Sequence, residues 1–411
     1  MNLRLYNKCA GQRTDKKEGY YGKKVTALVT LMSVFFVWFI PQARAVSENI
    51  LNRQTAVELV VKNSTQLWNA KEEERFAKEE YEEQAARAQS IDIEKFSFEN
   101  PFTGEEEYYY YTSAEQMQLR MAKEFVPESL KFSHEVKEKT VKVTENALSN
   151  AADELFLGLY STYHSVKLAE KGLELARKNL QRQQELFDKG IITELELEEA
   201  VLDLKEAENL VKKAKRDFEN MHRTFNRLAG LPLDFRYDLI GTPRTDAEDI
   251  RITEDEAVKS ALENRMEIWS TKRQIELVEL RMEIYRHKNV YKFDYYTIKD
   301  YAEAQDELEN LKLTLVQQEY DIEKEIRQAY KDLKKSYNNL KLAELNLERQ
   351  KNQLETLKKQ YEKGLIPASA VEQTELAISN LEFAVNMSLI SYLNKQDRFY
   401  RAISVGPGVT E

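Results

Sequence analysis

The segment LFDKGIITELELEEAVLDLKEAE, residues 186–208, recurs in related form as QYEKGLIPASAVEQTELAISNLE, residues 360–382. Lys-Gly stands at the same place in both, and aligning Gly190 with Gly364 sets an offset of 174 residues. The same offset, without a gap, also pairs Tyr163 with Tyr337, Leu168 with Leu342, Leu173 with Leu347, Leu180 with Leu354, Ile192 with Ile366, Glu198 with Glu372, Leu202 with Leu376 and Glu208 with Glu382. Matches at one fixed offset indicate a duplicated structural unit.

A second alignment, with an offset of 201 residues, extends the duplication toward the amino terminus. It pairs Ala56-Val57 with Ala257-Val258 and Trp68 with Trp269. The two offsets differ by 27 residues, so the first copy contains an insertion, which we place near residues 95–129. We therefore predict a first repeat over residues 46–231, a linker over 232–256, a second repeat over 257–402 and a tail over 403–411.

Composition and spacing predict that each repeat is helical. Charged residues make up 32% of the chain, which has only 12 Gly and 7 Pro among 411 residues. Apolar residues recur every three or four positions on both sides of Gly190, as in a coiled-coil seam. Each repeat reads as a short helix carrying the tryptophan, a long helix to the glycine and a long returning helix. The predicted fold is all-α dominated, a tandem repeat of long coiled-coil hairpins with at most a short β-hairpin.

The two glycines mark the tips of these hairpins. Lys-Gly ends a helix when the glycine adopts a left-handed conformation. In the first copy Thr193 can cap the returning helix, with Glu194 and Glu196 near its positive end. In the second copy Pro367 suits the first helical turn.

The amino terminus has the organisation of a secretory signal. A basic region precedes the apolar run Val25–Ile40, and Ala43-Arg44-Ala45 provides a small-x-small cleavage site. We predict a signal peptide over residues 1–45; an uncleaved anchor is the alternative, because 16 apolar residues fall just short of a membrane span. Export to the cell envelope follows in either case.

Charge and cysteine usage exclude several classes of protein. Residues 46–411 hold 53 basic and 69 acidic side chains, a net charge of −16, which disfavours a nucleic-acid partner. The only cysteine, Cys9, lies in the predicted signal, so residues 46–411 have no disulfide framework and no thiolate metal site.

No pattern in the sequence predicts catalysis. None of the histidines has a second histidine at ligand spacing: His134, His164, His222 and His287. Phosphate loops, nucleophile elbows and zinc motifs are absent from the sequence. We predict a protein that is not an enzyme and that has no cofactor or resident metal.

Taken together, these segments resemble the TolC family of outer-membrane efflux proteins. The resemblance rests on the two tip segments, on LAGLPLD at 228–234 and on EAVKSALENRMEI at 256–268, and it spans about residues 47–402. No single motif among them is specific; the duplication with its spacing is.

The resemblance implies a homotrimer whose hairpins form one hollow helical duct. In that family the duct acts passively in efflux or type I secretion, at the outer membrane and in the periplasm. Its tips meet a periplasmic adaptor, which couples to an inner-membrane pump. The tip residues expected to face the adaptor are Gly190, Ile191, Ile192, Thr193, Gly364, Leu365, Ile366 and Pro367.

The sequence departs from the family at the membrane end. Family members insert two strands per repeat, and a spanning strand needs roughly 9 to 11 residues. The second copy offers only VYKFDYYTIKD, residues 290–300, which is too short for a hairpin. The first copy offers KFSFENPFTGEEEYYYYT, residues 95–112, whose arms are about half the required length. A complete barrel is therefore not expected.

A second departure concerns the duct entrance. Acidic residues six and nine positions after the tip glycine can ring a closed entrance in the family. The first copy has Glu196 and Glu199 there, whereas the second has Ala370 and Gln373. The alternative is that these glutamates form a solvated face near a helix start.

Aromatic residues gather in the insertion: Phe96, Phe98, Phe102, Tyr108, Tyr109, Tyr110 and Tyr111. They could form an aromatic belt where the duct meets a membrane, or a tyrosine-rich loop packed on its own end of the assembly.

A further alternative for the whole chain is an exported coiled-coil structural or interaction protein without a barrel.

Overall fold

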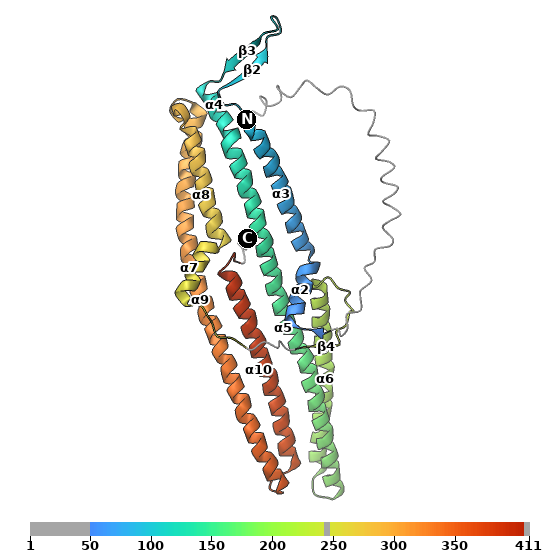
Figure 1. Ribbon diagram of the computed structural model, residues 1–411. Helices are drawn as coiled ribbons and strands as arrows, with labels where there is room; N and C mark the ends of the chain where they lie inside the picture. The colour runs from blue at the N-terminus through green and yellow to red at the C-terminus, as the bar shows by residue number, and fades with distance from the viewer. Residues whose placement is uncertain (1–49, 242–246, 407–411) are drawn as a thin grey trace, which may run out of the picture. The chain divides into compact units, whose positions relative to one another are not determined.

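The computed structural model describes residues 50–241 and 247–406 (Figure 1). The predicted signal peptide, residues 1–45, and the end of the predicted tail lie outside the described residues. Within the described residues most of the chain is helical, and the strands form two sheets of two strands each.

Two hairpins of long helices form the body of the structure (Figure 1). In the first repeat α5 (Val126–Asp188) runs to the glycine tip and α6 (Glu194–Leu228) returns from it. In the second repeat α9 (Tyr295–Glu362) and α10 (Ala368–Ala402) do the same. At 1.5 Å per residue, α5 and α9 are about 95 and 100 Å long. The predicted fold class is confirmed.

Each repeat opens with a short helix that ends before its tryptophan, so our assignment of the tryptophan to that helix was wrong. The four opening helices are α2 (Arg53–Asn63), α3 (Thr65–Gln89), α7 (Glu254–Asn264) and α8 (Met266–Tyr285). Ser64 breaks the first pair because its backbone is extended and its hydroxyl accepts a hydrogen bond from the Leu67 amide. Arg265 adopts a similar extended backbone in the second pair. Trp68 and Trp269 therefore belong to the longer helices α3 and α8.

Short strands occupy the connections. In the first-copy insertion β2 (Lys95–Glu99) pairs antiparallel with β3 (Glu106–Tyr110). Helix α4 (Ser113–Arg120) and a π-helical turn η1 (Met121–Phe125) then lead into α5. The corresponding connection in the second copy is the 3₁₀ turn η2 (His287–Lys292), and no strand lies among its described residues. The predicted short hairpin and the shorter second connection are both confirmed.

The predicted linker contains one short strand. β4 (Leu239–Ile240) pairs in parallel with β1 (Ile50–Leu51) at the start of the first repeat. Residues 242–246 of the linker lie outside the described residues, and α7 begins at Glu254. The linker therefore returns the chain to the beginning of the first repeat before the second repeat starts.

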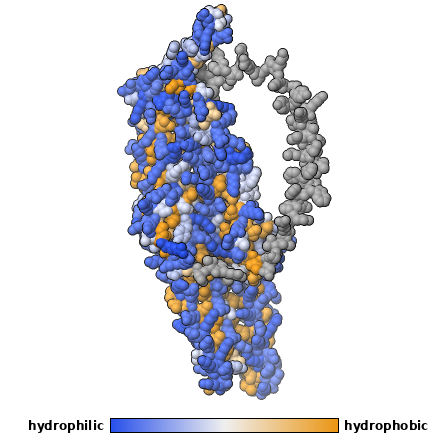
Figure 2. Space-filling model, viewed as in Figure 1, coloured by the Kyte–Doolittle hydropathy of each residue, from blue (hydrophilic) through white to orange (hydrophobic). Residues whose placement is uncertain are grey.

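The hairpins pack side by side. Helix α5 contacts α6 of its own hairpin and α10 of the other, and α10 contacts α9, which gives the order α6, α5, α10, α9. Nearer the other end, α3 packs on α5 and α8 packs on α9. On the face shown in Figure 2, apolar patches alternate with hydrophilic surface along both hairpins.

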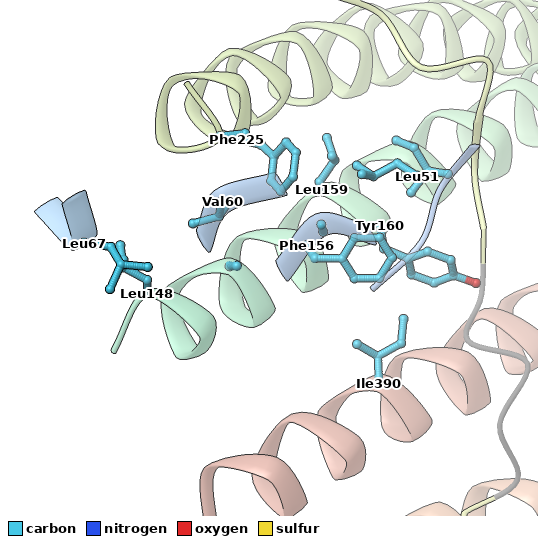
Figure 3. Close-up of a cluster of buried hydrophobic side chains, with 13 residues drawn as sticks. Leu51, Val60, Leu67, Leu148, Phe156, Leu159, Tyr160, Phe225 and Ile390 are labelled. Atoms are coloured by element: carbon cyan, nitrogen blue, oxygen red, sulfur yellow. The ribbon is translucent and has the colours of Figure 1, made fainter. Parts of the chain in front are cut away.

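The first of two main cores binds the repeats together. Phe156 and Tyr160 of α5 are fully buried beside Phe225 of α6, Val60 of α2 and Ile390 of α10 (Figure 3). Burying a side chain of this size contributes about 1.5 to 3 kcal/mol. Because Ile390 belongs to the second repeat, this core extends across the boundary between the copies.

The second core lies among α7, α9 and α10, where Tyr392 and Phe399 are buried. By length and composition alone, α10 is the one helix in the described part of the chain that could span a membrane. Its buried side, which includes Ile390, Tyr392 and Phe399, is divided between the two cores.

Candidate tips and the aromatic end

The first hairpin tip is a complete helix cap. Gly190 has φ +70°, and its amide donates to the Phe187 carbonyl at 2.8 Å. The Ile191 amide donates to the Leu186 carbonyl at 2.9 Å. These two bonds satisfy the last carbonyls of α5 in a Schellman motif.

The second tip repeats this geometry. Gly364 has φ +71°, and its amide donates to Tyr361 at 2.8 Å. The Leu365 amide donates to Gln360 at 3.0 Å. The left-handed glycines predicted from the two Lys-Gly pairs are thus present at both tips.

The two tips differ in how the returning helix begins. Thr193 accepts a hydrogen bond from the Glu196 amide at 3.3 Å, and Glu196 Oε2 accepts one from the Thr193 amide at 2.7 Å. This capping box satisfies two amides that the helix leaves free. Pro367 is the residue before α10, one position earlier than predicted, and makes no side-chain cap.

The tips lie next to each other and are exposed. Arg182 near the end of α5 donates to Glu372 near the start of α10 at 2.9 Å. Ile191 and Leu365 are apolar and yet 65% and 69% exposed. Ile192 and Ile366 are half-buried behind them. Both glycine tips therefore present apolar side chains to solvent at one end of the hairpin pair (Figure 1).

The two candidate entrance glutamates have different environments. The carboxylate of Glu196 is held by the backbone amide and hydroxyl of Thr193, and these hydrogen bonds lower its pKa. Glu199 is exposed. Glu196 therefore helps to cap the start of α6, whereas the sequence predicted Thr193 as the cap and Glu196 only as a charge near the positive end of the helix.

The opposite end of the hairpin pair carries the aromatic β-hairpin. Phe96 pairs across the strands with Tyr109, and their rings lie 5.4 Å apart. Tyr111 lies 5.7 Å from Phe96. Since side chains alternate along a strand, Phe96, Phe98, Tyr109 and Tyr111 share one face of the hairpin.

The other face and the turn of this hairpin are more polar. Tyr108 and Tyr110 lie there with Lys95, whose ammonium group is 3.8 Å from the centre of the Tyr108 ring. Phe102 stands in the turn and is 95% exposed. The hairpin therefore presents exposed aromatic rings on both faces and at its turn.

Sequence reasoning missed three further exposed aromatics at this end. Phe293, Tyr295 and Tyr296, at the start of α9, are 62%, 75% and 74% exposed. They lie near the hairpin because Gln116 of α4, just after β3, accepts hydrogen bonds from η2. The aromatic-rich stretch KFDYY, residues 292–296, is the signal in the sequence that indicates them.

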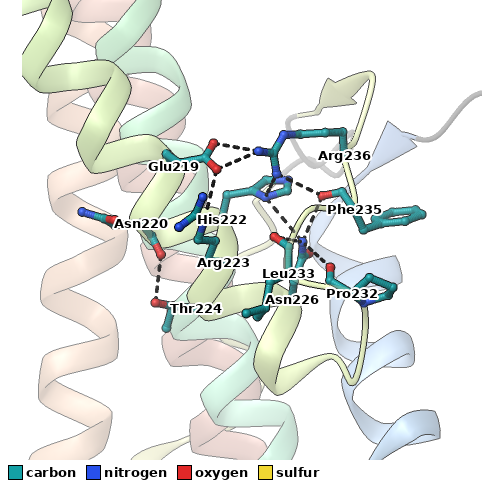
Figure 4. Close-up of polar contacts among 10 residues, drawn as sticks. All are labelled: Glu219, Asn220, His222, Arg223, Thr224, Asn226, Pro232, Leu233, Phe235 and Arg236. Atoms are coloured by element: carbon teal, nitrogen blue, oxygen red, sulfur yellow. Dashed lines mark hydrogen bonds and ion pairs between the residues drawn. The ribbon is translucent and has the colours of Figure 1, made fainter.

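A polar cluster fixes the linker to α6 (Figure 4). Asn226 donates to the carbonyls of Pro232, Leu233 and Phe235, at 2.9 Å in the last case. Arg236 binds Glu219 at 2.7 Å and donates to Nδ1 of His222 at 3.1 Å. Burial, and then the positive charge of Arg236, lowers the pKa of His222. The imidazole is therefore neutral and acts as an acceptor.

The tryptophans differ between the repeats. Trp269 packs 5.9 Å from Phe132 of α5 with Lys139 over its ring. Trp68, in contrast, is 62% exposed, so the tryptophan packs between helices in the second repeat and not in the first. Among the described residues, no group of three or more His, Cys, Asp or Glu is arranged to hold a metal.

Comparison with known proteins identifies the fold. No family model and no curated protein matches the sequence. Among solved structures, the chain resembles the CmeC outer membrane channel of Campylobacter jejuni, with 15% identity, a TM-score of 0.59 and 85% of each chain covered. It also resembles the outer membrane protein VceC of Vibrio cholerae, with 12% identity, a TM-score of 0.59 and coverage of 87% of this chain and 97% of that one.

A third similar structure is CusC, which has a TM-score of 0.59 and 11% identity; the match covers 86% of this chain and 92% of CusC. These identities are low, so the likeness is one of fold. The duplicated hairpins, their glycine tips and this likeness agree: the chain has the fold of the TolC-family outer-membrane channels.

Proposed function

We propose that this protein is a trimeric duct of the cell envelope that acts passively in efflux or type I secretion, together with a periplasmic adaptor and an inner-membrane pump. The observation that carries the proposal is the pair of adjacent helical hairpins whose glycine tips are exposed at one end. The solved neighbours with this fold are outer membrane channels and not enzymes, which supports a transport role at the outer membrane or elsewhere in the envelope.

The outer edges of the hairpin pair support self-association. In the part of the chain that the structure describes, helices α6 and α9 each pack extensively on a helix of the hairpins on one side only. Along them Leu202, Leu210, Leu342 and Leu345 are between 58% and 62% exposed. A cyclic, head-to-tail arrangement lets α6 of one copy cover α9 of the next and leaves no free edge.

The tips are the proposed adaptor contact. Ile191 and Leu365 offer exposed apolar side chains on backbones that the Schellman bonds hold rigidly. Contact residues on rigid caps lose little conformational entropy when a partner binds. In a closed ring, the acidic entrance would be formed by Glu199 and by Oε1 of Glu196, the carboxylate oxygen that does not bind Thr193.

The aromatic hairpin and the α9 start are the proposed membrane contact. Phe102, Tyr110, Tyr295 and Tyr296 are at least 69% exposed at the end opposite the tips. Tyrosine and tryptophan collect at membrane interfaces, where an apolar ring and a polar group are both solvated. The strands have five residues each, so this contact would be interfacial.

The alternative function is an exported coiled-coil structural protein. Mass and membrane partition of the chain expressed without residues 1–45 distinguish the two. A trimer that floats with vesicles supports the duct. A membrane-free monomer or dimer supports the structural protein.

A quadruple variant tests the membrane contact by changing four residues to Ser: Phe102, Tyr110, Tyr295 and Tyr296. It should remain trimeric but no longer bind to vesicles. Trp68→Ser, which removes an exposed ring away from this end, is the matched control. Equal vesicle binding by the quadruple variant and the control would contradict the membrane contact.

A further inference from the structure

The boundary between the two repeats contains a buried ionic junction. Arg53 of α2 binds Asp153 of α5, with Nη2 and Oδ2 3.0 Å apart, and it also binds Asp397 of α10. A second contact joins Arg53 Nε and Asp153 Oδ1 at 2.9 Å as an ion pair without hydrogen-bond alignment. Asp153 is 2% exposed. Because α10 belongs to the second repeat, this junction joins one repeat of the chain to the other.

The duplication assigns an equivalent to each of the three residues. The offset of 201 residues places Glu254 of α7 at the position of Arg53, and the offset of 174 places Arg327 of α9 at that of Asp153 and Arg223 of α6 at that of Asp397. The helices that carry them have equal lengths, 11 residues in α2 and α7 and 35 in α6 and α10. All three charges are reversed.

Two of the reversed residues already meet within the chain. Arg327 Nη1 lies 3.1 Å from Glu254 Oε1, as Arg53 meets Asp153 in the first repeat. Arg327 also binds Asp255 at 3.0 Å and Glu323 at 2.9 Å. This cluster has three carboxylates and one guanidinium. Its net charge is therefore negative, and a further cation would be attracted to it.

The third residue, Arg223, lies on a free face of α6. Its side chain is 56% exposed and contacts Glu219 of its own helix. It belongs to an exposed stripe whose members follow one another at three- or four-residue spacing: Glu198, Leu202, Lys205, Asn209, Lys212, Arg216, Asn220, Arg223 and Arg227. On α10 the equivalent stripe packs against α5, through contacts such as Arg182 with Glu372 and Lys171 with Ser379.

We propose that this stripe of α6 docks on α9 and α7 of a second copy of the chain, with Arg223 of one copy binding Glu254 of the other. The proposal rests on the proposed self-association and names its contact. The chain's own junction between α5 and α10 is the template, and the charge-deficient Arg327 cluster supplies the complementary partner.

The reversal of charge also selects between the two junctions. If α10 of another copy replaced α6 on this edge, Asp397 would face Glu254. If α6 replaced α10 on the first repeat, Arg223 would face Arg53. Both exchanges bring like charges together, and specificity arises when the wrong partner is repelled as well as the right one attracted. The inference is that the repeats alternate strictly around the assembly.

The same alignment locates a repulsive position in the seam. Ile390 of α10 is fully buried in the core with Tyr160 of α5, and their equivalents are Arg216 of α6 and Lys334 of α9. Both equivalents are exposed in the single chain. The docked seam therefore brings two cations together here, and Arg216→Glu should strengthen the same contact that Arg223→Glu weakens.

Bismaleimide crosslinking of the full chain with Cys9→Ser tests the contact, because no other cysteine is present. A variant with both Arg223→Cys and Glu254→Cys should give covalent dimers and trimers. Either single variant should stay uncrosslinked, since a head-to-tail contact joins two different positions. Crosslinking by one single variant would overturn the proposal in favour of a two-fold contact.

Sedimentation of the charge variants separates this proposal from the proposed function. Arg223→Glu should raise the dissociation constant at least tenfold, and Arg216→Glu should lower it. One outcome is that the unmodified chain is trimeric while the two charge variants have equal dissociation constants and the double-cysteine variant does not crosslink. In that case the proposed contact is wrong, and the proposed duct function is unaffected. A monomeric unmodified chain would remove both.

Discussion

Alanine at the tip glycines should destabilise the tips for a conformational reason alone. Gly190 and Gly364 have φ +70° and +71°, and a Cβ built on either meets no atom within 4 Å. The left-handed conformation costs an L-residue about 1 to 2 kcal/mol, and the lower entropy of the unfolded alanine chain offsets part of this. We expect a net loss of about 1 kcal/mol at each tip.

The same substitution within α5 provides a control of opposite sign. Gly172 lies inside the helix, has no positive φ, and a Cβ there also meets nothing within 4 Å. Alanine in a helix interior is favoured over glycine by about 0.5 to 1 kcal/mol. Gly172→Ala should therefore stabilise the hairpin that Gly190→Ala weakens.

Amide hydrogen exchange measures the effect where it occurs. The Ile191 and Leu365 amides donate across the tips, so Gly190→Ala should lower protection of Ile191 about fivefold and leave Leu365 unchanged. Gly364→Ala should do the reverse, and Gly190→Asn should keep most of the protection because Asn tolerates the left-handed region. The reasoning is refuted if Gly190→Ala and Gly172→Ala change stability in the same direction.

Three further predictions concern the core, the linker and the entrance. Phe156→Ala should cost about 3 to 5 kcal/mol in urea unfolding because the ring is fully buried, whereas Phe102→Ala, at 95% exposure, should change it by less than about 0.5 kcal/mol. The pKa of His222 is lowered in the folded state, so its contribution to stability is present above the unfolded pKa of 6.5 and is lost as pH falls through the folded value; melting temperatures at pH 7.5 and 5.5 should differ less in His222→Gln. Glu196→Gln keeps a capping side chain and Glu199→Gln removes only charge, so both variants should preserve the melting temperature. Both should increase the ion leak through a reconstituted duct. An unchanged leak in both variants would exclude an acidic entrance ring.

Local chemistry made the tips predictable. A left-handed cap, a glycine and a Thr-x-x-Glu capping box are each determined by residues within one turn of each other, so Gly190, Thr193 and Glu196 could be interpreted without tertiary structure. The short β-hairpin was predictable for the same reason, because its length is set between Lys95 and Tyr110.

Features that depend on which neighbour a residue meets were not predictable in this way. Trp68 and Trp269 occupy equivalent positions, and both α3 and α8 contact α5. Trp269 nevertheless packs against Phe132 of α5, whereas the Trp68 indole is exposed. The cluster of His222 and Arg236 likewise forms only because the linker folds back over α6. Periodicity identifies an apolar face of a helix, but it does not state whether the same chain covers that face.

The differences between the repeats carry information that their similarities do not. Positions with the same surroundings in both copies kept the same chemistry, as Phe225 and Phe399 did, both of which are buried. Positions whose surroundings differ within one chain diverged: Ile390 is buried against α5, whereas its equivalent Arg216 is exposed on α6. An exposed isoleucine stripe on α6 would be an aggregation hazard before assembly, and a charged stripe avoids it. The proposed seam between chains is therefore more polar than the seam within the chain, and we expect added salt to weaken it more than it weakens the internal seam.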